Sequence, residues 1–161
     1  MCHHYGLCSS IEHSIALFGI GPGSRMLQFA SCSFDASVLE VTLALCSGAQ
    51  LHLMPGSALP LGDALLGLLH ERGITHAVLS PSALATLPAE ACLPSLETVI
   101  VGGEVFPPAL AAQWAGRCHV FNAYGPTEAT IMATVHRCDG PDHFAQIHRL
   151  QLVPVQERSP L

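Results

Sequence analysis

Short apolar runs alternate with amphipathic stretches along most of this chain. Runs of mostly apolar residues with the length and composition of buried strands cover 26–30, 50–54, 76–79, 98–101 and 118–121. Between them lie segments whose apolar residues recur at helical spacing, at 37–47, 62–71, 82–87 and 107–115. Gly48 and Gly73 follow two of these segments and Pro107-Pro108 begin the last, as is typical of helix ends and starts.

This alternation predicts an α/β fold with a parallel sheet. Strands joined by helices of this length need crossover connections, which make the strands parallel. Ligands of such sheets bind beyond the carboxyl ends of the strands. Turns rich in glycine and polar residues follow predicted strands at 33–37, 80–82, 102–104 and 122–128. We expect residues 1–140 to form a partial domain core, and residues 141–161, with three prolines and no regular period, to form a divergent, loose tail.

Composition narrows the function classes. The 161 residues are 50% hydrophobic and 11% charged, which suits a buried core and not a disordered linker. A formal net charge of −6 with six Lys and Arg argues against a nucleic-acid partner, because phosphates bind to basic faces. No apolar run reaches the roughly 18–20 residues of a membrane span, and the first residues lack a signal-peptide pattern. We expect a cytoplasmic protein without a membrane or nucleic-acid partner.

Seven cysteines, most of them in apolar segments, form no Cys-x-x-Cys pair. We expect buried, reduced thiols that pack as small hydrophobic side chains. Cys2, His3, His4 and Cys8, with His13 beyond, could supply soft ligands to zinc. Zinc binding is the weaker alternative, because the second ligand pair of typical zinc sites is absent. The scattered histidines are expected to be exposed or partly buried; they are His13, His52, His70 and His76.

Residues 122–131, Asn-Ala-Tyr-Gly-Pro-Thr-Glu-Ala-Thr-Ile, carry the strongest functional signal. The Gly-Pro step favours an extended turn after Tyr124, whose ring can lie flat against a purine. The Asn122 amide can donate and accept at a base edge. Thr127 can hydrogen-bond a phosphate oxygen, and Glu128 can hold a magnesium ion. The alternative is a strand-to-helix turn in which Thr127 caps the helix.

Three other segments are weaker when each is taken alone. Asp35, in Ser-Phe-Asp-Ala-Ser at 33–37, stands between a predicted strand and an apolar helix, so it is a helix N-cap candidate. Gly102-Gly103-Glu104 has the composition of an ordinary turn. Residues 19–23 contain three glycines but precede a strand, so we interpret them as a turn and not as a phosphate cradle. The sequence has no Gly-x-Ser-x-Gly elbow of a nucleophilic hydrolase.

Together, segments 33–37 and 122–131 resemble the adenylate-forming enzymes, in particular the amino-acid adenylation domains of non-ribosomal peptide synthetases. The resemblance extends from about Tyr5 to Gly140. It implies a partial N-terminal core of such an enzyme, with an amino acid and ATP as substrates and Mg²⁺ as cofactor. It also implies transfer of the aminoacyl group to the phosphopantetheine thiol of a carrier protein, in a synthetase that includes condensation modules.

The resemblance also assigns residues to roles. Asp35 would accept hydrogen bonds from the α-ammonium group of the amino acid. Thr127 and Glu128 would be catalytic, and Glu128 would bind Mg²⁺. The nucleotide would lie against Gly102, Gly103, Glu104, Asn122, Ala123, Tyr124, Gly125 and Thr127. The amino-acid pocket would be lined by Asp35, Ala36, Leu39, Val78, Ile100, Gly102, Ala123, Ile131 and Met132. Because all of these except Asp35 are apolar or small, we expect a mid-sized aliphatic substrate.

Several parts of that family have no counterpart in this sequence. They are the phosphate loop with its lysine, the aspartate that binds the ribose, the hinge, and the small C-terminal domain with the catalytic lysine. Because the sequence after Gly140 also departs from the family pattern, we expect a truncated or frame-shifted fragment that is inactive alone. Two alternatives stay open: a non-catalytic remnant with exposed apolar edges, and a fragment of an acyl-CoA or aryl-acid ligase. Asp35 disfavours the second, because those substrates carry no α-ammonium group.

Overall fold

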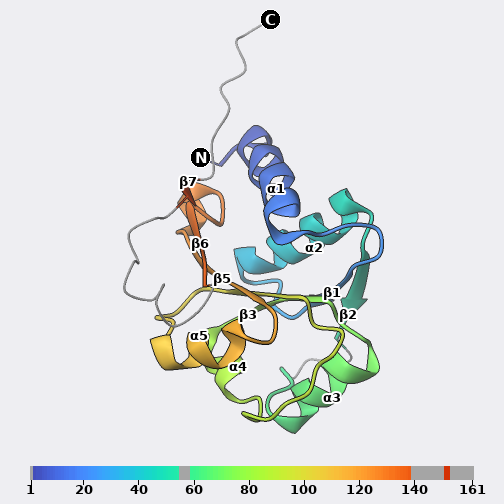
Figure 1. Cartoon of the computed structure of the whole chain (residues 1–161). Helices are drawn as coiled ribbons and strands as arrows, with labels where there is room; N and C mark the ends of the chain where they lie inside the picture. The colour runs from blue at the N-terminus through green and yellow to red at the C-terminus, as the bar shows by residue number, and fades with distance from the viewer. Residues whose placement is uncertain (1, 55–58, 139–150, 153–161) are drawn as a thin grey trace, which may run out of the picture.

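A computed structural model describes residues 2–54, 59–138 and 151–152 of the chain. A seven-stranded sheet crosses the middle of the molecule, in the order β2-β1-β3-β4-β5-β6-β7 (Figure 1). The strands are β1 (Arg25–Gln28), β2 (Gln50–Leu53), β3 (His76–Leu79), β4 (Thr98–Val101), β5 (His119–Tyr124), β6 (Thr134–Arg137) and β7 (Gln151–Leu152). The helices are α1 (His4–Phe18), α2 (Asp35–Ser47), α3 (Asp63–Glu71), α4 (Pro81–Ala85), α5 (Pro108–Ala115) and the 3₁₀ turn η1 (Thr127–Ala129).

The predicted α/β fold with a parallel sheet is confirmed for five strands. Strands β2, β1, β3, β4 and β5 pair in parallel, each within a few residues of its predicted bounds. The antiparallel strands β6 and β7 are not predicted by the sequence pattern. Strand β6 forms because the chain doubles back directly after the 125–131 turn, and the Ala133 N–H donates to the Tyr124 carbonyl at 3.0 Å.

Helices cover both faces of the sheet (Figure 1). Helices α1 and α2 lie on one face, and α3, α4 and α5 lie on the other. Sequence patterning misses α1, because half of its buried positions are serines: Ser10 and Ser14 are buried beside Ile11 and Phe18. The small side chains suit close packing of α1 against α2, and Ser14 Oγ donates back to the Ser10 carbonyl at 2.7 Å.

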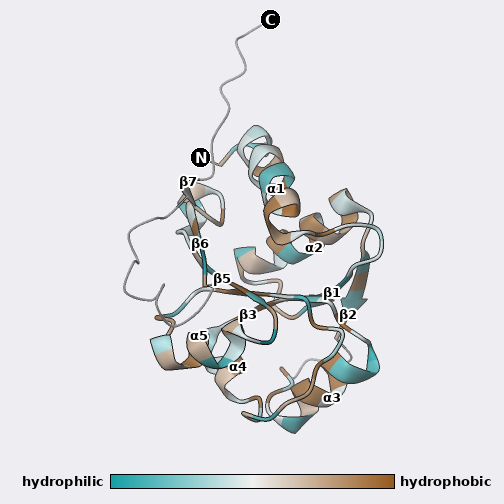
Figure 2. Cartoon of the chain, viewed as in Figure 1, coloured by the Kyte–Doolittle hydropathy of each residue, from teal (hydrophilic) through white to brown (hydrophobic). Residues whose placement is uncertain are grey.

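The core is divided into two apolar clusters by the sheet. Strand β4 is buried along its whole length, and its side chains alternate between the clusters. Val99 and Val101 join Leu69, Leu84 and Trp114 on the α3–α5 face. Ile100 joins the residues under α1 and α2, among them Phe18, Leu43 and Phe121. Apolar residues, brown in Figure 2, occur in helices on both faces of the sheet.

The prediction that the cysteines are buried is wrong for most of them. All seven are free, but only Cys138 is buried, Cys118 is half-buried, and the other five are exposed. In α2, for example, Cys46 is exposed, whereas Ala44, two residues earlier, has no exposed surface. Within residues 2–54, 59–138 and 151–152, no three His, Cys, Asp or Glu side chains are placed to hold a metal ion, so the zinc alternative has no site there.

The prediction that His76 is exposed or partly buried is also wrong, because only 1% of it is exposed. It lies on β3, a central strand, where burial is tolerable because both ring nitrogens have partners. Its Nε2 donates to the Phe18 carbonyl at 3.1 Å, and its Nδ1 lies 2.7 Å from Thr75 Oγ1. Burial lowers the pKa of His76 below its usual 6.5, despite the opposing effects of the Phe18 carbonyl and of Glu97.

Two further observations bear on the remaining expectations. In the described part of the chain, every helix is too short or too polar to cross a bilayer. The expected loose tail, residues 141–161, lies outside the described residues except for Gln151–Leu152, which pair with β6.

Candidate functional site at the carboxyl ends of the strands

Asp35 is the first residue of α2, not the residue that caps it. The N-cap position is occupied by Phe34, and its side chain makes no capping hydrogen bond. Asp35 is half-buried. Among the described residues no hydrogen bond or salt bridge to its carboxylate is found. The helix-cap interpretation of Asp35 is therefore wrong, and the carboxylate is available to a ligand.

Asp35 lines a pocket of about 230 Å³ that also includes two other residues expected at the site, Thr127 and Ile131. The sequence assigns none of the remaining lining residues to this pocket; they are Cys2, His3, His4, Leu7, Val38 and Thr130. Four of these six precede α1 or lie in its first turn, so recognising α1 would be the signal that finds them. Three segments that are distant in sequence thus meet around one small cavity.

The backbone of residues 125–131 is tightly constrained. A Cβ on Gly125 would lie 2.5 Å from the Ala133 nitrogen and 2.7 Å from the Ile131 carbonyl oxygen, so no side chain fits there. Thr130 and Ile131 have φ angles of 62° and 72°, which β-branched residues rarely adopt. Such strain persists only where the surrounding structure enforces it, and it is concentrated at functional sites.

Thr127 opens a short 3₁₀ turn and caps no helix. The N-cap of η1 is Pro126, and no side chain makes a capping hydrogen bond there. The Cys2 Sγ lies 3.3 Å from the Thr127 carbonyl oxygen and 3.5 Å from that of Glu128, which ties the segment before α1 to this turn. Among the described residues the Thr127 hydroxyl and the Glu128 carboxylate have no partner, so both are free to contact a ligand.

The predicted nucleotide-binding turns lie side by side because β4 and β5 are neighbours. Val101 at the end of β4 is in register with Asn122 of β5. A Cβ on Gly102 would lie 2.9 Å from the Ala123 carbonyl oxygen, so glycine permits this close approach. Gly103, with φ of 84°, turns the chain away from the sheet.

Glu104 and Tyr124 have different surroundings within these turns. The Glu104 carboxylate accepts hydrogen bonds from the Ser82 hydroxyl at 2.8 Å and the Ser82 N–H at 3.2 Å. It therefore holds the start of α4 against the end of β4. Tyr124 is 69% exposed, which leaves its ring available to stack on a base.

The residues expected to line the amino-acid pocket are gathered on the α1–α2 face, but most are covered. Leu39, Ile100, Ala123 and Met132 belong to the buried cluster there, and Val78 and Ile131 pack against it. Ala36 and Gly102 are half-buried. Of the nine expected residues, only Asp35 and Ile131 line the pocket itself. The apolar set forms a core in contact with the pocket through Ile131 and Leu7.

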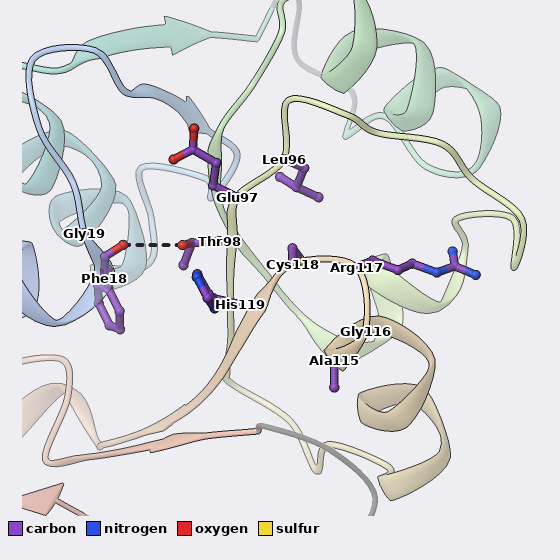
Figure 3. Close-up of a pocket in the computed structure, with 10 residues that line it drawn as sticks. All are labelled: Phe18, Gly19, Leu96, Glu97, Thr98, Ala115, Gly116, Arg117, Cys118 and His119. Carbon is purple, nitrogen blue, oxygen red and sulfur yellow. Dashed lines mark hydrogen bonds between the residues drawn. The ribbon is translucent and has the colours of Figure 1, made fainter.

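A larger pocket, of about 670 Å³, lies at the opposite ends of β4 and β5 (Figure 3). It is lined by Phe18, Gly19, Leu96–Thr98 and Ala115–His119, and by none of the residues expected at the site. Its Thr98 hydroxyl donates to the Phe18 carbonyl at 3.3 Å. We place the candidate site at the smaller pocket, because the carboxyl ends of parallel strands are where such sheets bind ligands.

The fixed charges are distributed unevenly between the two ends of the strands. The four described arginines lie at the amino ends of the parallel strands. Arg25 begins β1, Arg72 and Arg117 shortly precede β3 and β5, and Arg137 hydrogen-bonds His119, the first residue of β5. The candidate pocket has no arginine in its lining. Glu128, exposed and unpaired among the described residues, fits a role as a single carboxylate ligand of Mg²⁺ bound to phosphates.

Comparison with known proteins gives concordant results. The sequence model of the AMP-binding enzyme family matches residues 1–153. The chain is 45% identical over 149 residues to phosphinothricin tripeptide synthetase PhsC of Streptomyces viridochromogenes, which covers 92% of this chain and 13% of that protein. It is 47% identical over 124 residues to chondramide synthase cmdD of Chondromyces crocatus, which covers 77% of this chain and 3% of that protein.

Solved structures show the same fold. The adenylation domain AlmE of Vibrio cholerae, in complex with glycyl-adenosine-5'-phosphate, matches with a TM-score of 0.73 at 30% identity, over 83% of this chain and 26% of that one. The non-ribosomal peptide synthetase FmoA3 matches with a TM-score of 0.79 at 25% identity, over 85% of this chain and 16% of that one. The chain thus spans a small part of each relative, and it belongs to the AMP-binding enzyme family, where it is similar to the adenylation domains of non-ribosomal peptide synthetases.

Proposed function

We propose that this chain is the part of an adenylation domain that binds the amino acid and the adenine of ATP. The complete enzyme would activate an amino acid as its aminoacyl-adenylate and transfer it to the phosphopantetheine thiol of a carrier protein, beside condensation modules. The observation that carries the proposal is that Asp35, Thr127 and Ile131, from two distant segments, line one small pocket. Its Asp35 carboxylate is half-buried and has no partner among the described residues.

Asp35 would accept hydrogen bonds from the α-ammonium group of the substrate. A carboxylate facing an ammonium group in a partly dry pocket makes a charge-assisted contact, about twice as strong as a neutral hydrogen bond. An acyl or aryl acid without that ammonium group would leave Asp35 desolvated and unpaired. The pocket therefore favours an amino acid over the substrates of acyl-CoA and aryl-acid ligases.

The nucleotide would occupy the turns after β4 and β5. The Tyr124 ring would stack on adenine, the Asn122 amide would hydrogen-bond the base edge, and Gly102-Gly103 would allow close approach of the backbone. The Thr127 hydroxyl would donate to a phosphate oxygen. Glu128 would hold Mg²⁺, which when bound neutralises negative charge on the phosphates.

The residues of the site would align the two reactants. A carboxylate oxygen of the amino acid attacks the α-phosphorus of ATP, the bond from that phosphorus to the bridging oxygen breaks, and pyrophosphate leaves. Asp35 would fix the amino acid by its ammonium end, and Thr127 would fix the phosphates, so that attacking oxygen and phosphorus lie close together. An aliphatic side chain would be directed at Ile131 and the apolar cluster that includes Leu39 and Met132.

The chain alone is expected to bind ligand without catalysing the reaction. All six of its Lys and Arg residues are arginines. None of the four that the structure describes lines the pocket, so none of these four is placed there to stabilise the transition state. We predict that amino-acid-dependent exchange between ATP and pyrophosphate by the purified chain stays at background. Exchange clearly above background with one amino acid would contradict this expectation.

Binding tests the proposal directly. The chain would be titrated calorimetrically with a panel of aliphatic aminoacyl sulfamoyl-adenosines and with their counterparts that lack the α-amino group. We expect the amino form to bind about ten- to a hundredfold more tightly, as for a hydrogen bond to a charged group. Asp35→Asn should remove most of this preference. The control is Glu97→Gln, which changes an exposed acid that lines the other pocket and should keep the preference.

The remaining outcomes identify the alternatives. Tighter binding of acyl or aryl sulfamoyl-adenosines than of the aminoacyl forms would indicate a fragment of an acyl-CoA or aryl-acid ligase. No binding by any member of the panel, from protein that is folded by circular dichroism, would indicate a non-catalytic remnant.

A further inference from the structure

Glu40 is a buried acid that the proposed mechanism does not use. It lies on α2, five positions after Asp35, and none of its surface is exposed. Burial raises its pKa to about 7 from 4.5, and the groups that oppose this shift are the backbone N–H groups of Ala30 and Phe29 and the side chain of Gln28. No cation is among them. A carboxyl group kept in such a position without a counter-ion must be compensated by its hydrogen bonds.

Those hydrogen bonds all go to the end of β1. The Ala30 N–H donates to both carboxyl oxygens of Glu40, at 3.1 Å each. Gln28 Nε2 lies 3.4 Å from Glu40 Oε2 and also donates to the Ala30 carbonyl. Ala30 lies beyond the last residue of β1, so these side chains take the place of a sheet partner. Together, Glu40 and Gln28 hold both polar backbone groups of Ala30.

The chain that follows Ala30 leads directly to Asp35. Residues 31–34 form an exposed turn, closed by the hydrogen bond from the Phe34 N–H to the Ser31 carbonyl at 2.9 Å. The far end of this turn is held by Ser37, whose hydroxyl donates to the Phe34 carbonyl at 2.7 Å. The turn is therefore anchored to α2 at both ends, by Glu40 before it and by Ser37 after it.

We propose that Glu40 is a positioning residue for the substrate's amino group: by holding Ala30, it fixes the 31–34 turn and the first turn of α2, and so directs Asp35 into the pocket. This inference rests on the proposed function, because it assigns Glu40 a role through Asp35. It predicts that losing the Glu40 contact weakens recognition of the ammonium group more than recognition of the rest of the ligand. A role in stability alone would affect all ligands alike.

The test compares variants in the same calorimetric titration. The probes are the tightest-binding aliphatic aminoacyl sulfamoyl-adenosine and its counterpart without the α-amino group. Glu40→Ala should reduce the preference for the amino form at least about fivefold, a fraction of what a charged hydrogen bond provides, while the affinity for the other probe changes less than about threefold. Glu40→Gln keeps one acceptor oxygen for the Ala30 N–H and should retain an intermediate preference.

Leu43→Ala is the matched structural control. Leu43 is also fully buried on α2, in the apolar cluster under α1 and α2. Its side chain makes no hydrogen bond to the 31–34 turn. It should lower the melting temperature as Glu40→Ala does, yet keep the preference for the amino form. Glu40→Ala should also speed hydrogen exchange at the Ala30 amide, which Leu43→Ala should leave protected.

Three results would overturn the inference. The first is an unchanged preference in Glu40→Ala, and the second is an equal loss in Glu40→Ala and Leu43→Ala. The third is a wild-type chain with no preference for the amino form, which removes the role of Asp35 and so the proposed function itself. The rate of hydrogen exchange at the Ala30 amide distinguishes these failures. If Glu40→Ala speeds this exchange without reducing the preference for the amino form, only the role assigned to Glu40 is overturned.

Discussion

The two ends of the parallel strands differ in what their polar side chains do. At the amino ends, polar groups are bonded within the fold: Thr98 and His76 both donate to the Phe18 carbonyl, and Arg117 donates to the Ala89 carbonyl. At the carboxyl ends, Asp35 and Thr127 have no such partners among the described residues. These groups at the amino ends stabilise the fold, whereas Asp35 and Thr127 remain available to a ligand, although Glu104 at the same ends of the strands is bonded to Ser82.

The backbone differs in the same direction. The turn that carries Thr127 contains the two non-glycine residues with positive φ in the described chain, Thr130 and Ile131. At the amino ends, Gly116 has an ordinary φ of −90° and open space around it. Pocket size alone would point to the amino ends, where the larger cavity lies. The proposed site therefore rests on free polar groups and enforced backbone strain, and not on cavity volume.

The largest expected effect comes from Gly125→Ala. The new Cβ would lie 2.5 Å from the Ala133 nitrogen, so the 125–131 turn must move. We expect a loss of about 1–3 kcal/mol of unfolding free energy, typical of overpacking. We also expect more than about a hundredfold loss of affinity for an aminoacyl sulfamoyl-adenosine. Several contacts to the ligand are displaced together, and each loss of about 1.4 kcal/mol lowers the affinity tenfold.

Gly116→Ala is the control from the other end of the strands. Nothing lies within 4 Å of a Cβ at Gly116. It should leave both the urea midpoint and the affinity unchanged. Equal effects of the two alanines would remove the contrast between the two ends.

His76→Leu should have the opposite character, costing stability without affecting binding. The substitution removes the Nε2 hydrogen bond to the Phe18 carbonyl and leaves the Thr75 hydroxyl without its ring partner. We expect a loss of about 1–3 kcal/mol of unfolding free energy in urea titrations. Ligand affinity, measured well below the unfolding midpoint, should stay within about twofold of wild type, since binding differences below this are under about 0.5 kcal/mol. A loss of affinity without a loss of stability would contradict the structural role assigned to His76 at the amino end of β3.

Much of this contrast is accessible from the sequence, but not all of it. The strand runs and the glycine and polar turns predict five parallel strands and the segments that meet at their carboxyl ends. The Asn122–Ile131 motif is recognisable because its aromatic, hydroxyl and carboxyl groups are closely spaced. Helix α1 is hidden because Ser10 and Ser14 occupy core-facing positions. Four of the nine residues that line the pocket lie in the first turn of α1 or directly before it, and local periodicity cannot reveal them.

Burial is the least predictable property. Cysteines in apolar segments are expected inside, yet five of the seven are exposed. For Cys8 and Cys46, which lie in helices, the reason is that the covered face of a helix depends on neighbours distant in sequence. The burial of Glu40 is equally hidden in the sequence. An acid in an apolar helix is normally exposed, and its burial depends on the Ala30 N–H, which only the end of β1 supplies.

A more gradual effect is expected in the pH dependence of stability. The Glu40 pKa is raised to about 7 from 4.5 by burial, so the folded state holds a proton that the unfolded state has released between these values. Its contribution to stability is full below pH 4.5 and is lost as the pH rises through 7. Wild type should lose about 1 kcal/mol per pH unit relative to Glu40→Gln across this interval. Parallel curves from urea titrations at about pH 5, 6 and 7 would contradict this.

The smallest effect is expected from Arg117→Ala. Arg117 is exposed, donates to the Ala89 carbonyl and lies 5.5 Å from the centre of the Trp114 ring. Exposed contacts of this kind contribute about 0.5–1 kcal/mol. The melting temperature should fall by a few degrees, as expected for a change of this size in free energy. Binding of the aminoacyl sulfamoyl-adenosine should not change, and a tenfold loss of affinity would place the ligand at the amino ends.

Hydrogen–deuterium exchange of the chain with and without an aliphatic aminoacyl sulfamoyl-adenosine tests the central claim most directly, because it reports both ends of the strands in one experiment. We predict that ligand slows exchange in residues 33–38 and 122–131, and leaves residues 96–98 and 115–119 unchanged. Protection confined to residues 96–98 and 115–119 would contradict the account, since it would place the ligand in the pocket at the amino ends of the strands.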